Sequence, residues 1–375
     1  MENIKSPLQV GNITLQHRIV LAPLTRFRAD DNYVPLPMVK DYYAQRASLP
    51  GTLLITEGTF ISARAGGFPN VPGIYNDEQI KAWKEVTDAV HAKGSFIFCQ
   101  LWALGRAADA KVLTAEGYPV VSSGDIPISE ERAVPKPLDE NGIQELIGDY
   151  AQAAKCAMEA GFDGVEIHGA NGYLCDQFLQ DTCNNRNDRW GGSIENRSRF
   201  GIEVAKAVSE AIGSEKTAYR VSPWSPFQGM GMADPKPQFT HIVQNLAKLK
   251  LAYLHVVESR IGGASECEGA YESTDFVIDA FANSGPVILA GGFTPETANK
   301  TIEKHTGRRI AIAFGRYYIS TPDLPFRAIN HIDLTPYNRD TFYIPKSPVG
   351  YVDYPNSPQY DAWASTKSEM SPLQN

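Results

Sequence analysis

Eight short, almost continuously apolar runs recur along the chain, and this repetition constrains the fold more than any other feature. The runs span residues 18–24, 52–60, 95–102, 164–170, 217–223, 252–258, 286–292 and 309–316. Strands of a parallel sheet have this character, because they are buried on both faces and neither face requires polar residues. The runs therefore predict eight buried strands.

Helical patterns lie between these runs. One helix is expected before Gly94, a second between Asp139 and Gly161, and a third between Ser193 and Gly213. A serine or aspartate can cap the first turn of a helix, and glycine is common just after the last turn. No run is followed by the GxGxxG turn of a dinucleotide-binding fold. The alternation therefore favours the α/β class and a single (β/α)8 TIM barrel.

Two segments depart from this rhythm within what we expect to be one domain over residues 1–375. Residues 106–138 form a long insertion after the third strand, and we expect a lid or capping hairpin there, since structureless loops of that length are uncommon. The tail, about residues 335–375, carries aromatic residues at 337, 342, 343, 351 and 354. It is expected to pack against the barrel.

The bulk properties narrow the class of partner. A net charge of −8 and a pI near 5.5 argue against nucleic acid, which requires a basic surface, and favour a small molecule. No apolar stretch is long enough for a membrane span or a secretion signal, so we expect no membrane partner and a cytoplasmic protein. The five cysteines form no CxxC pair and the seven histidines are scattered, so no metal site is expected.

The end of the fourth run carries the strongest candidate for chemistry. In GVEIHGANGY, residues 164–173, His168, Asn171 and Tyr173 stand close together, and Gly169 and Gly172 would let the backbone bend tightly. Active sites of barrels gather at the carboxyl ends of the strands. Taken alone, a histidine at a strand end is more often structural than catalytic. Its spacing from Asn171 and Tyr173 favours two N–H donors and one phenol on one cavity wall.

The stretch HGANGYLCDQF followed by DRWGGSIENRSRF closely resembles the old yellow enzyme family of FMN-dependent reductases. The resemblance extends from about residue 8 to 355 and includes APLTRFR at 22–28, LITEGT at 54–59, QLWALGR at 100–106 and LAGGF at 289–293. The chain looks most like the fungal members. The resemblance implies FMN as cofactor, NADPH as electron donor, and reduction of the C=C bond of α,β-unsaturated aldehydes or ketones.

The resemblance also implies a role for each residue of the motif. His168 and Asn171 would donate hydrogen bonds to the carbonyl oxygen of the substrate, where negative charge develops during hydride transfer to the β-carbon. Tyr173 would protonate the α-carbon, since an ordinary tyrosine is protonated at neutral pH. Trp102 and Tyr343, with Phe227 as a further candidate, would form the substrate wall.

The flavin is expected to contact residues far apart in the sequence. A glycine pair ends the seventh apolar run, and a glycine followed by an arginine ends the eighth, at the two loops where barrels commonly bind phosphate. Either set of glycines alone would suggest ordinary turns. These residues are Gly291, Gly292, Gly315 and Arg316. The resemblance assigns the flavin ring to Pro23, Leu24, Thr25, Gly58, Gln100 and Arg220. Without it, Arg220 would more simply form a salt bridge on the rim of the barrel.

Three alternatives stay open at this point. The first is a flavin-dependent isomerase of an unsaturated aldehyde in fungal secondary metabolism, because some relatives carry phenylalanine at the position of Tyr173 and isomerise instead of reducing. The second, a lyase barrel with a phosphate-bearing substrate, would need a strand-end lysine, and Lys216 precedes its strand. The third is a flavin-binding protein without turnover. We expect either a monomer or a homodimer.

Overall fold

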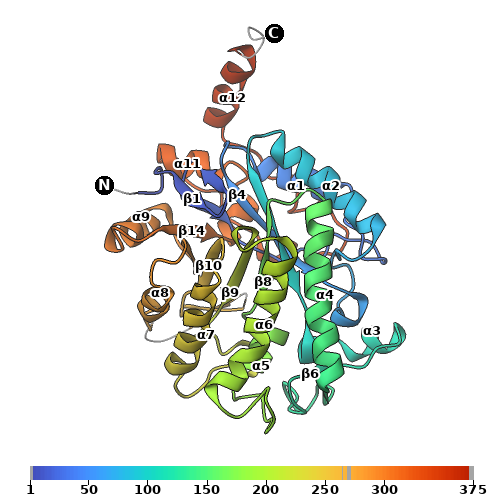
Figure 1. Cartoon of the computed structure of the whole chain (residues 1–375). Coiled ribbons are helices and arrows are strands. Elements are labelled where there is room, and N and C mark those ends of the chain that lie inside the picture. The colour runs from blue at the N-terminus through green and yellow to red at the C-terminus, as the bar shows by residue number, and fades with distance from the viewer. Residues whose placement is uncertain (1–2, 264, 268–271, 371–375) are drawn as a thin grey trace.

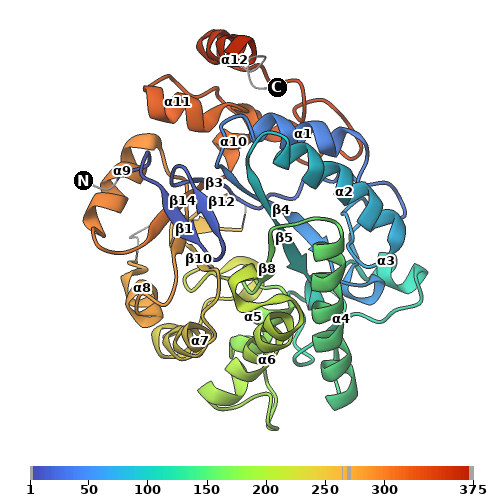
Figure 2. The ribbon, with the colours of Figure 1, turned by 45° about the horizontal axis from the view of Figure 1, so that its top comes forward.

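Eight parallel strands close into a barrel, and around the barrel they follow the order of the chain (Figures 1 and 2). The computed structural model describes residues 3–263, 265–267 and 272–370. The barrel strands are β3 (Ile19–Leu21), β4 (Leu53–Phe60), β5 (Phe96–Trp102), β8 (Gly164–His168), β9 (Thr217–Val221), β10 (Tyr253–Val257), β13 (Val287–Ala290) and β14 (Ile310–Phe314). Each strand lies within one of the apolar runs, which confirms the predicted TIM barrel.

Helices surround the barrel (Figure 2). They are α1 (Met38–Arg46), α2 (Asp77–His91), α4 (Glu140–Glu159), α5 (Leu174–Leu179), α6 (Ile194–Ile212), α7 (Lys236–Lys248), α8 (Asp275–Phe281), α9 (Pro295–Lys304), α10 (Arg316–Ser320) and α11 (Leu324–Asn330). The predicted caps are confirmed: the Asp139 side chain accepts a hydrogen bond from the N–H of Gly142, and Ser193 accepts one from Asn196.

A short antiparallel pair closes the amino end of the barrel. It consists of β1 (Leu8–Val10) and β2 (Ile13–Leu15), and its apolar side chains cluster with the lower interior of the barrel, including Phe98 and Tyr253. The ring centroids of Phe98 and Tyr253 are 5.5 Å apart. Apolar side chains of the described residues therefore fill this end of the barrel.

The insertion contains α3 (Ala110–Ala115), β6 (Val121–Ser122) and β7 (Lys136–Pro137). The two strands run parallel, so the expected hairpin is wrong: the chain between them crosses back before it pairs. The segment is attached to α5, where the hydroxyl of Ser122 donates to Oε1 of Gln177 at 2.8 Å and that of Ser123 donates to its carbonyl at 2.7 Å. Its role as a lid stays a prediction.

Part of the C-terminal tail packs against the barrel: residues 342–351 lie against Arg26 and Arg28, whose guanidinium groups bind backbone carbonyls of this segment. Arg26 donates through Nη2 to the carbonyl of Gly350 at 2.8 Å, and Arg28 donates through Nη1 to that of Phe342 at 2.8 Å. Both guanidinium groups are buried. Backbone carbonyls of the tail therefore accept hydrogen bonds from both cations, Nη1 of Arg26 has no partner among the described residues, and the buried Glu57 adds a favourable negative charge beside them.

The last described helix, α12 (Pro358–Met370), extends away from the barrel (Figure 1). Residues 371–375 of the expected tail lie outside the described residues. Among the helices that the structure describes, none combines the length and apolar character needed to cross a bilayer.

Candidate active site

A cavity of about 530 Å³ opens at the carboxyl ends of the barrel strands. This volume is within the range of small-molecule sites. The fifteen residues predicted from the sequence all line it: Pro23, Leu24, Thr25, Gly58, Gln100, Trp102, His168, Asn171, Tyr173, Arg220, Gly291, Gly292, Gly315, Arg316 and Tyr343. The structure therefore brings the predicted catalytic, cofactor and substrate residues to one place, although this does not assign their roles.

His168 is the last residue of β8 and lies in the cavity wall as a neutral donor. Burial lowers its pKa well below the usual value, and the positive charge of Arg220 adds to this effect. The backbone N–H of Ala170 points at Nδ1, 3.4 Å away. Since Nδ1 accepts, the single ring proton is placed on Nε2. His168 therefore has one N–H donor that is not used within its own loop.

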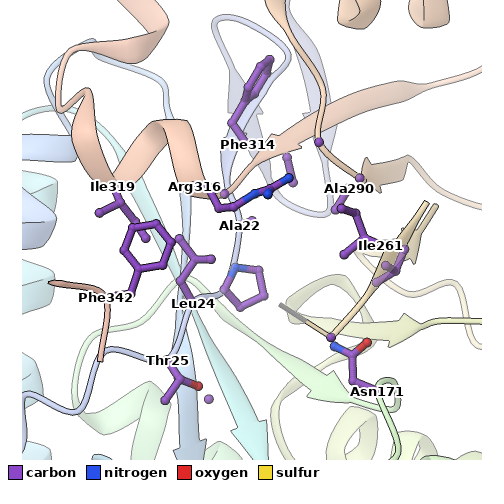
Figure 3. Close-up of a pocket in the computed structure, with 18 of the residues that line it drawn as sticks. Ala22, Leu24, Thr25, Asn171, Ile261, Ala290, Phe314, Arg316, Ile319 and Phe342 are labelled. Carbon is purple, nitrogen blue, oxygen red and sulfur yellow. The ribbon is translucent and has the colours of Figure 1, made fainter. Parts of the chain in front are cut away.

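Asn171 follows in a left-handed backbone conformation with a φ of 58°. Its N–H donates to the hydroxyl of Ser222 at 2.8 Å, and its carbonyl accepts from Nε2 of Gln228 at 2.8 Å. Its side-chain oxygen is buried without a hydrogen-bond partner. In Figure 3 the amide nitrogen is on the side that faces the cavity. The backbone contacts thus aim a second N–H donor at the cavity.

Gly169 and Gly172 in this loop are required to be glycine for different structural reasons. Gly172 has a φ of 75°, which other residues rarely adopt. Gly169 does not have a positive φ, but a Cβ there would lie 2.2 Å from the ring of Tyr219. The expectation that both glycines allow a tight bend is therefore wrong for Gly169, where close packing against β9 is the cause.

Tyr173 completes this wall. Its ring contacts Trp102 edge-on, with centroids 4.8 Å apart, and lies 4.9 Å from the ring of His168. Burial raises the pKa of its phenol well above the usual value, and a hydrogen bond with the side chain of Gln228 offsets only part of this effect. Tyr173 is therefore a protonated phenol throughout the neutral pH range.

Two polar side chains form the floor of the cavity. Nε2 of Gln100, on β5, donates to Oε1 of the buried Glu166 at 2.8 Å. Arg220, on β9, is only 8% exposed and its Nε has no hydrogen-bond partner. Arg220 is therefore not a salt bridge on the rim, and a buried cation with an unused donor lines the cavity.

The opposite side of the cavity includes glycines that follow β13 and β14, and Arg316. Gly292, after β13, has a φ of 64°, and a Cβ on Gly291 would lie 2.4 Å from Cβ of Glu258. Arg316 begins α10, and its Nη2 donates to Oε1 of Glu266 at 2.6 Å. In Figure 3, Arg316 and Asn171 lie on opposite sides of the cavity. A cation near exposed backbone suits an anionic group.

A bulge in β4 shapes the wall between these two sides. The register of β4 with β5 shifts between Ile55 and Gly58. A Cβ on Gly58 would lie 2.4 Å from Cε3 of Trp102, so glycine is needed there for the indole to pack. Trp102 is almost fully buried and its Nε1 has no partner. Pro23, Leu24 and Thr25 follow β3 at this end of the barrel.

Sequence reasoning missed much of the cavity mouth. Lining residues that were not predicted include Phe27, Phe68, Glu266, Tyr337 and Phe342, and the predicted candidate Phe227 also lines it. Glu266 belongs to a two-stranded pair, β11 (Ile261–Gly262) and β12 (Ser265–Glu266). No lining residue comes from the described insertion. The clustering of aromatic residues in the tail was the only local signal for this mouth.

The cysteines and the possible metal ligands are arranged as follows. Cys175 is 1% exposed, and burial raises the pKa of its thiol to about 12. Cys175 is therefore a small buried residue whose thiol stays protonated at neutral pH, which does not suit a nucleophile. Within the described residues, the structure contains no cluster of three or more metal-binding side chains.

Comparisons with known proteins identify the family. Residues 3–335 match the NADH:flavin oxidoreductase / NADH oxidase family. The chanoclavine-I aldehyde reductase fgaOx3 of Penicillium roqueforti is 56% identical, with 96% of this chain and 98% of that protein covered. The NADP-dependent oxidoreductase lnbE of Aspergillus flavus is 52% identical, with 96% and 97% covered. A protein of Epichloe festucae var. lolii named probable inactive reductase easA is 53% identical, with 96% of each chain covered.

Among solved structures, the crystal structure of old yellow enzyme from Pichia sp. AKU4542 has a TM-score of 0.88 and 39% sequence identity, covering 95% of this chain and 94% of that chain. The agreement in sequence extends over nearly the whole chain, and the barrel is shared. The chain therefore belongs to the NADH:flavin oxidoreductase / NADH oxidase family, as a fungal member of the old yellow enzymes, and is an oxidoreductase.

Proposed function

We propose that this protein is an NADPH-dependent, FMN-containing ene-reductase that reduces the C=C bond of α,β-unsaturated aldehydes and ketones. One observation carries the proposal: the Nε2–H of His168, the amide of Asn171 and the phenol of Tyr173 converge on one wall of the cavity. Two donors suit a carbonyl oxygen, and the phenol suits a carbon that must be protonated.

The cavity has the groups that FMN requires. Gln100 and the buried Arg220 would hold the polar edge of the ring, and the unpartnered Nε of Arg220 would gain a partner there. Backbone at Gly292 and Gly315, together with Arg316, would hold the phosphate, provided that Glu266 releases or shares the guanidinium. When bound, FMN would take a hydride from NADPH and deliver it from N5 to the β-carbon of the substrate.

His168 and Asn171 would stabilise the transition state more than the bound substrate. Negative charge grows on the carbonyl oxygen as the β-carbon receives hydride, so fixed donors bind the transition state more tightly than the neutral ground state. His168 can fill this role because its imidazole is neutral and its Nδ1 accepts from the backbone. Removing one donor of this kind costs about 3–4 kcal/mol in other enzymes.

Tyr173 would supply the proton that completes the reduction. The substrate gains a hydride at the β-carbon and a proton at the α-carbon, while NADPH is oxidised to NADP⁺. Burial keeps the phenol protonated, and its contacts with Trp102 and His168 hold the ring beside the donor pair. This hydroxyl favours the reductase over the isomerase.

Two relatives carry names that support the choice of substrate and electron donor. One is named an aldehyde reductase and another an NADP-dependent oxidoreductase. A third is named a probable inactive reductase, so turnover by this chain has to be measured directly. The aromatic mouth of the cavity, which includes Phe27 and Tyr343 with ring centroids 5.9 Å apart, favours an apolar substrate body.

The test begins with the purified protein. We expect a yellow protein whose absorbance shows the flavin bands, which NADPH bleaches under anaerobic conditions and cyclohexenone restores, with the saturated ketone as product. A folded, colourless protein that does not bind added FMN would refute the assignment. A flavin that NADPH reduces, with an isomerised aldehyde and no saturated product, would instead establish the isomerase.

A further inference from the structure

A buried carboxylate lies directly beneath the floor of the cavity. Oε1 of Glu166 accepts from Nε2 of Gln100 at 2.8 Å, and its Oε2 lies 2.8 Å from Nδ1 of His255. The side chains of Glu166 and His255 are both 0% exposed. Of these three residues only Gln100 lines the cavity. Glu166 and His255 therefore cannot contact a ligand there, and they can affect a bound ligand only through a neighbouring residue.

Strand register brings these groups together. Gln100 of β5 pairs with Glu166 of β8, and Arg220 of β9 pairs with His255 of β10. Residues two apart on a strand share a face, so Glu166 points into the barrel like His168. The four polar groups form one layer above the apolar interior that the amino-terminal strands close. A charged residue inside a continuously apolar run was the sequence signal for this layer.

The carboxylate is ionised and satisfied. Burial alone would raise the pKa of Glu166, but His255, Arg220 and Gln100 outweigh it and the pKa is lowered. Burial lowers the pKa of His255 and the charge of Glu166 opposes this effect. Because an ionised carboxylate has no proton to give, the proton between the two side chains is on Nδ1 of His255 and is donated to Glu166. An ionised carboxylate only accepts hydrogen bonds. It therefore fixes the amide of Gln100 with nitrogen towards Glu166, which leaves the amide oxygen for the cavity.

We propose that Glu166, oriented by His255, is a positioning residue with two effects on the floor of the cavity. It fixes the amide of Gln100, so that the amide oxygen can accept a hydrogen bond from the imide N–H of the flavin ring. It also offsets the charge of Arg220, so that the reduced flavin meets only part of a positive charge. The inference rests on FMN as the proposed cofactor. It gives Glu166 and His255 a role in cofactor binding although neither residue contacts flavin or substrate. The negative charge of Glu166 makes the bound flavin harder to reduce, because the reduced ring carries more negative charge.

Three variants test this. Glu166→Gln keeps the shape but removes the charge and lets the amide of Gln100 turn over. His255→Leu removes the donor to Glu166, whereas His255→Asn places an amide N–H near the position of Nδ1. FMN affinity is measured by quenching of flavin fluorescence, the midpoint potential by equilibration with a redox dye under NADPH-free conditions, and stability by thermal unfolding.

We expect Glu166→Gln to weaken FMN binding about tenfold or more, the effect of one lost buried hydrogen bond. Its midpoint potential should rise, since removing a negative charge and exposing the charge of Arg220 both favour reduced flavin. His255→Leu should shift both quantities in the same direction, and His255→Asn should restore them.

The outcomes separate this inference from the proposed function. Wild-type protein that binds no FMN would overturn the proposed function and this inference with it. Wild-type protein that binds FMN, with variants of unchanged affinity and potential, would overturn only the positioning role. A lower unfolding temperature with an unchanged potential would show a purely structural pair. If Glu166→Gln does not fold, the comparison of His255→Leu with His255→Asn decides the question alone.

Discussion

Substitution of Tyr173 by phenylalanine tests the assignment of the proton donor. The change removes one hydroxyl and keeps the ring, whose edge contacts with Trp102 and His168 place centroids 4.8 Å and 4.9 Å away. The hydrogen bond lost is the one with the side chain of Gln228. Stability should therefore fall by no more than about 1 kcal/mol, the net value of one hydrogen bond.

The expected loss is confined to one half of the catalytic cycle. General acid catalysis contributes about 10²–10⁴-fold, which is about 2.7–5.4 kcal/mol at 1.36 kcal/mol per decade. Reoxidation of the reduced enzyme by cyclohexenone should slow by this factor, because the enolate must then wait for water. Reduction by NADPH should keep its rate, since that step needs no proton from Tyr173.

Anaerobic stopped-flow absorbance measures the two half-reactions separately. Tyr343→Phe is a matched control, because Tyr343 lines the same cavity but is 46% exposed and has no proposed role as acid. Because burial raises the pKa of Tyr173, the wild-type rate of reoxidation should also show no decline from loss of this proton between about pH 6 and 9. Equal reoxidation rates for Tyr173→Phe and wild type would show that the proton comes from elsewhere.

Three further predictions address the other parts of the cavity and the stability of its wall. Wild-type protein titrated with a para-substituted phenol should show a long-wavelength absorption. A His168→Ala/Asn171→Ala double variant should lose this absorption and affinity for the phenol, and equal phenol affinity in the two proteins would exclude the donor role. Arg316→Ala should weaken FMN binding about ten- to hundredfold, because it removes a charge-assisted hydrogen bond of about 1.5–3 kcal/mol. Glu266→Gln should tighten FMN binding by up to about fivefold, because it removes an exposed ion pair that competes with the phosphate. Fluorescence titration that shows FMN affinity for Arg316→Ala equal to or higher than that for Glu266→Gln would contradict the phosphate site. Glu57 lies in β4, where its Oε2 accepts a hydrogen bond from the backbone N–H of Arg26 at 3.1 Å, and burial raises its pKa from 4.5 to about 7. Its contribution to stability is therefore complete below pH 4.5 and is lost as the pH rises through 7. The stability of Glu57→Gln relative to wild type in urea unfolding should increase from pH 5 to 8 by at most about 3 kcal/mol, and a constant difference would contradict this prediction.

The barrel could be predicted because its signals are local. Each strand is buried on both faces and so reads as an apolar run, and helix ends are marked by residues such as Asp139 and Ser193, whose side chains cap the adjacent N–H groups. The loop with His168 and Asn171 was found because all its members lie within ten residues. Its neutral imidazole depends on burial and on the charge of Arg220, and its tautomer depends on backbone geometry, none of which a local pattern contains.

Features that depend on distant partners were not predicted. The pairing of β6 with β7 and of β11 with β12 involves strands of two residues, too short to have a pattern. Gly169 was explained by backbone freedom, but its cause is the ring of Tyr219 on the next strand. The pairing of Glu166 with His255 joins residues 89 positions apart, so only the barrel register reveals it.

The attachment of the tail to Arg26 and Arg28 has a consequence for the order of events during synthesis. Phe342 and Tyr343 supply part of the cavity wall, and their segment is held by guanidinium groups that lie 314 and 324 positions earlier in the chain than their carbonyl partners. During synthesis the two arginines therefore emerge before these carbonyls, and the strands between them can already fold. A nascent chain would thus have every residue of the donor loop before it has residues 342 and 343 of the cavity wall.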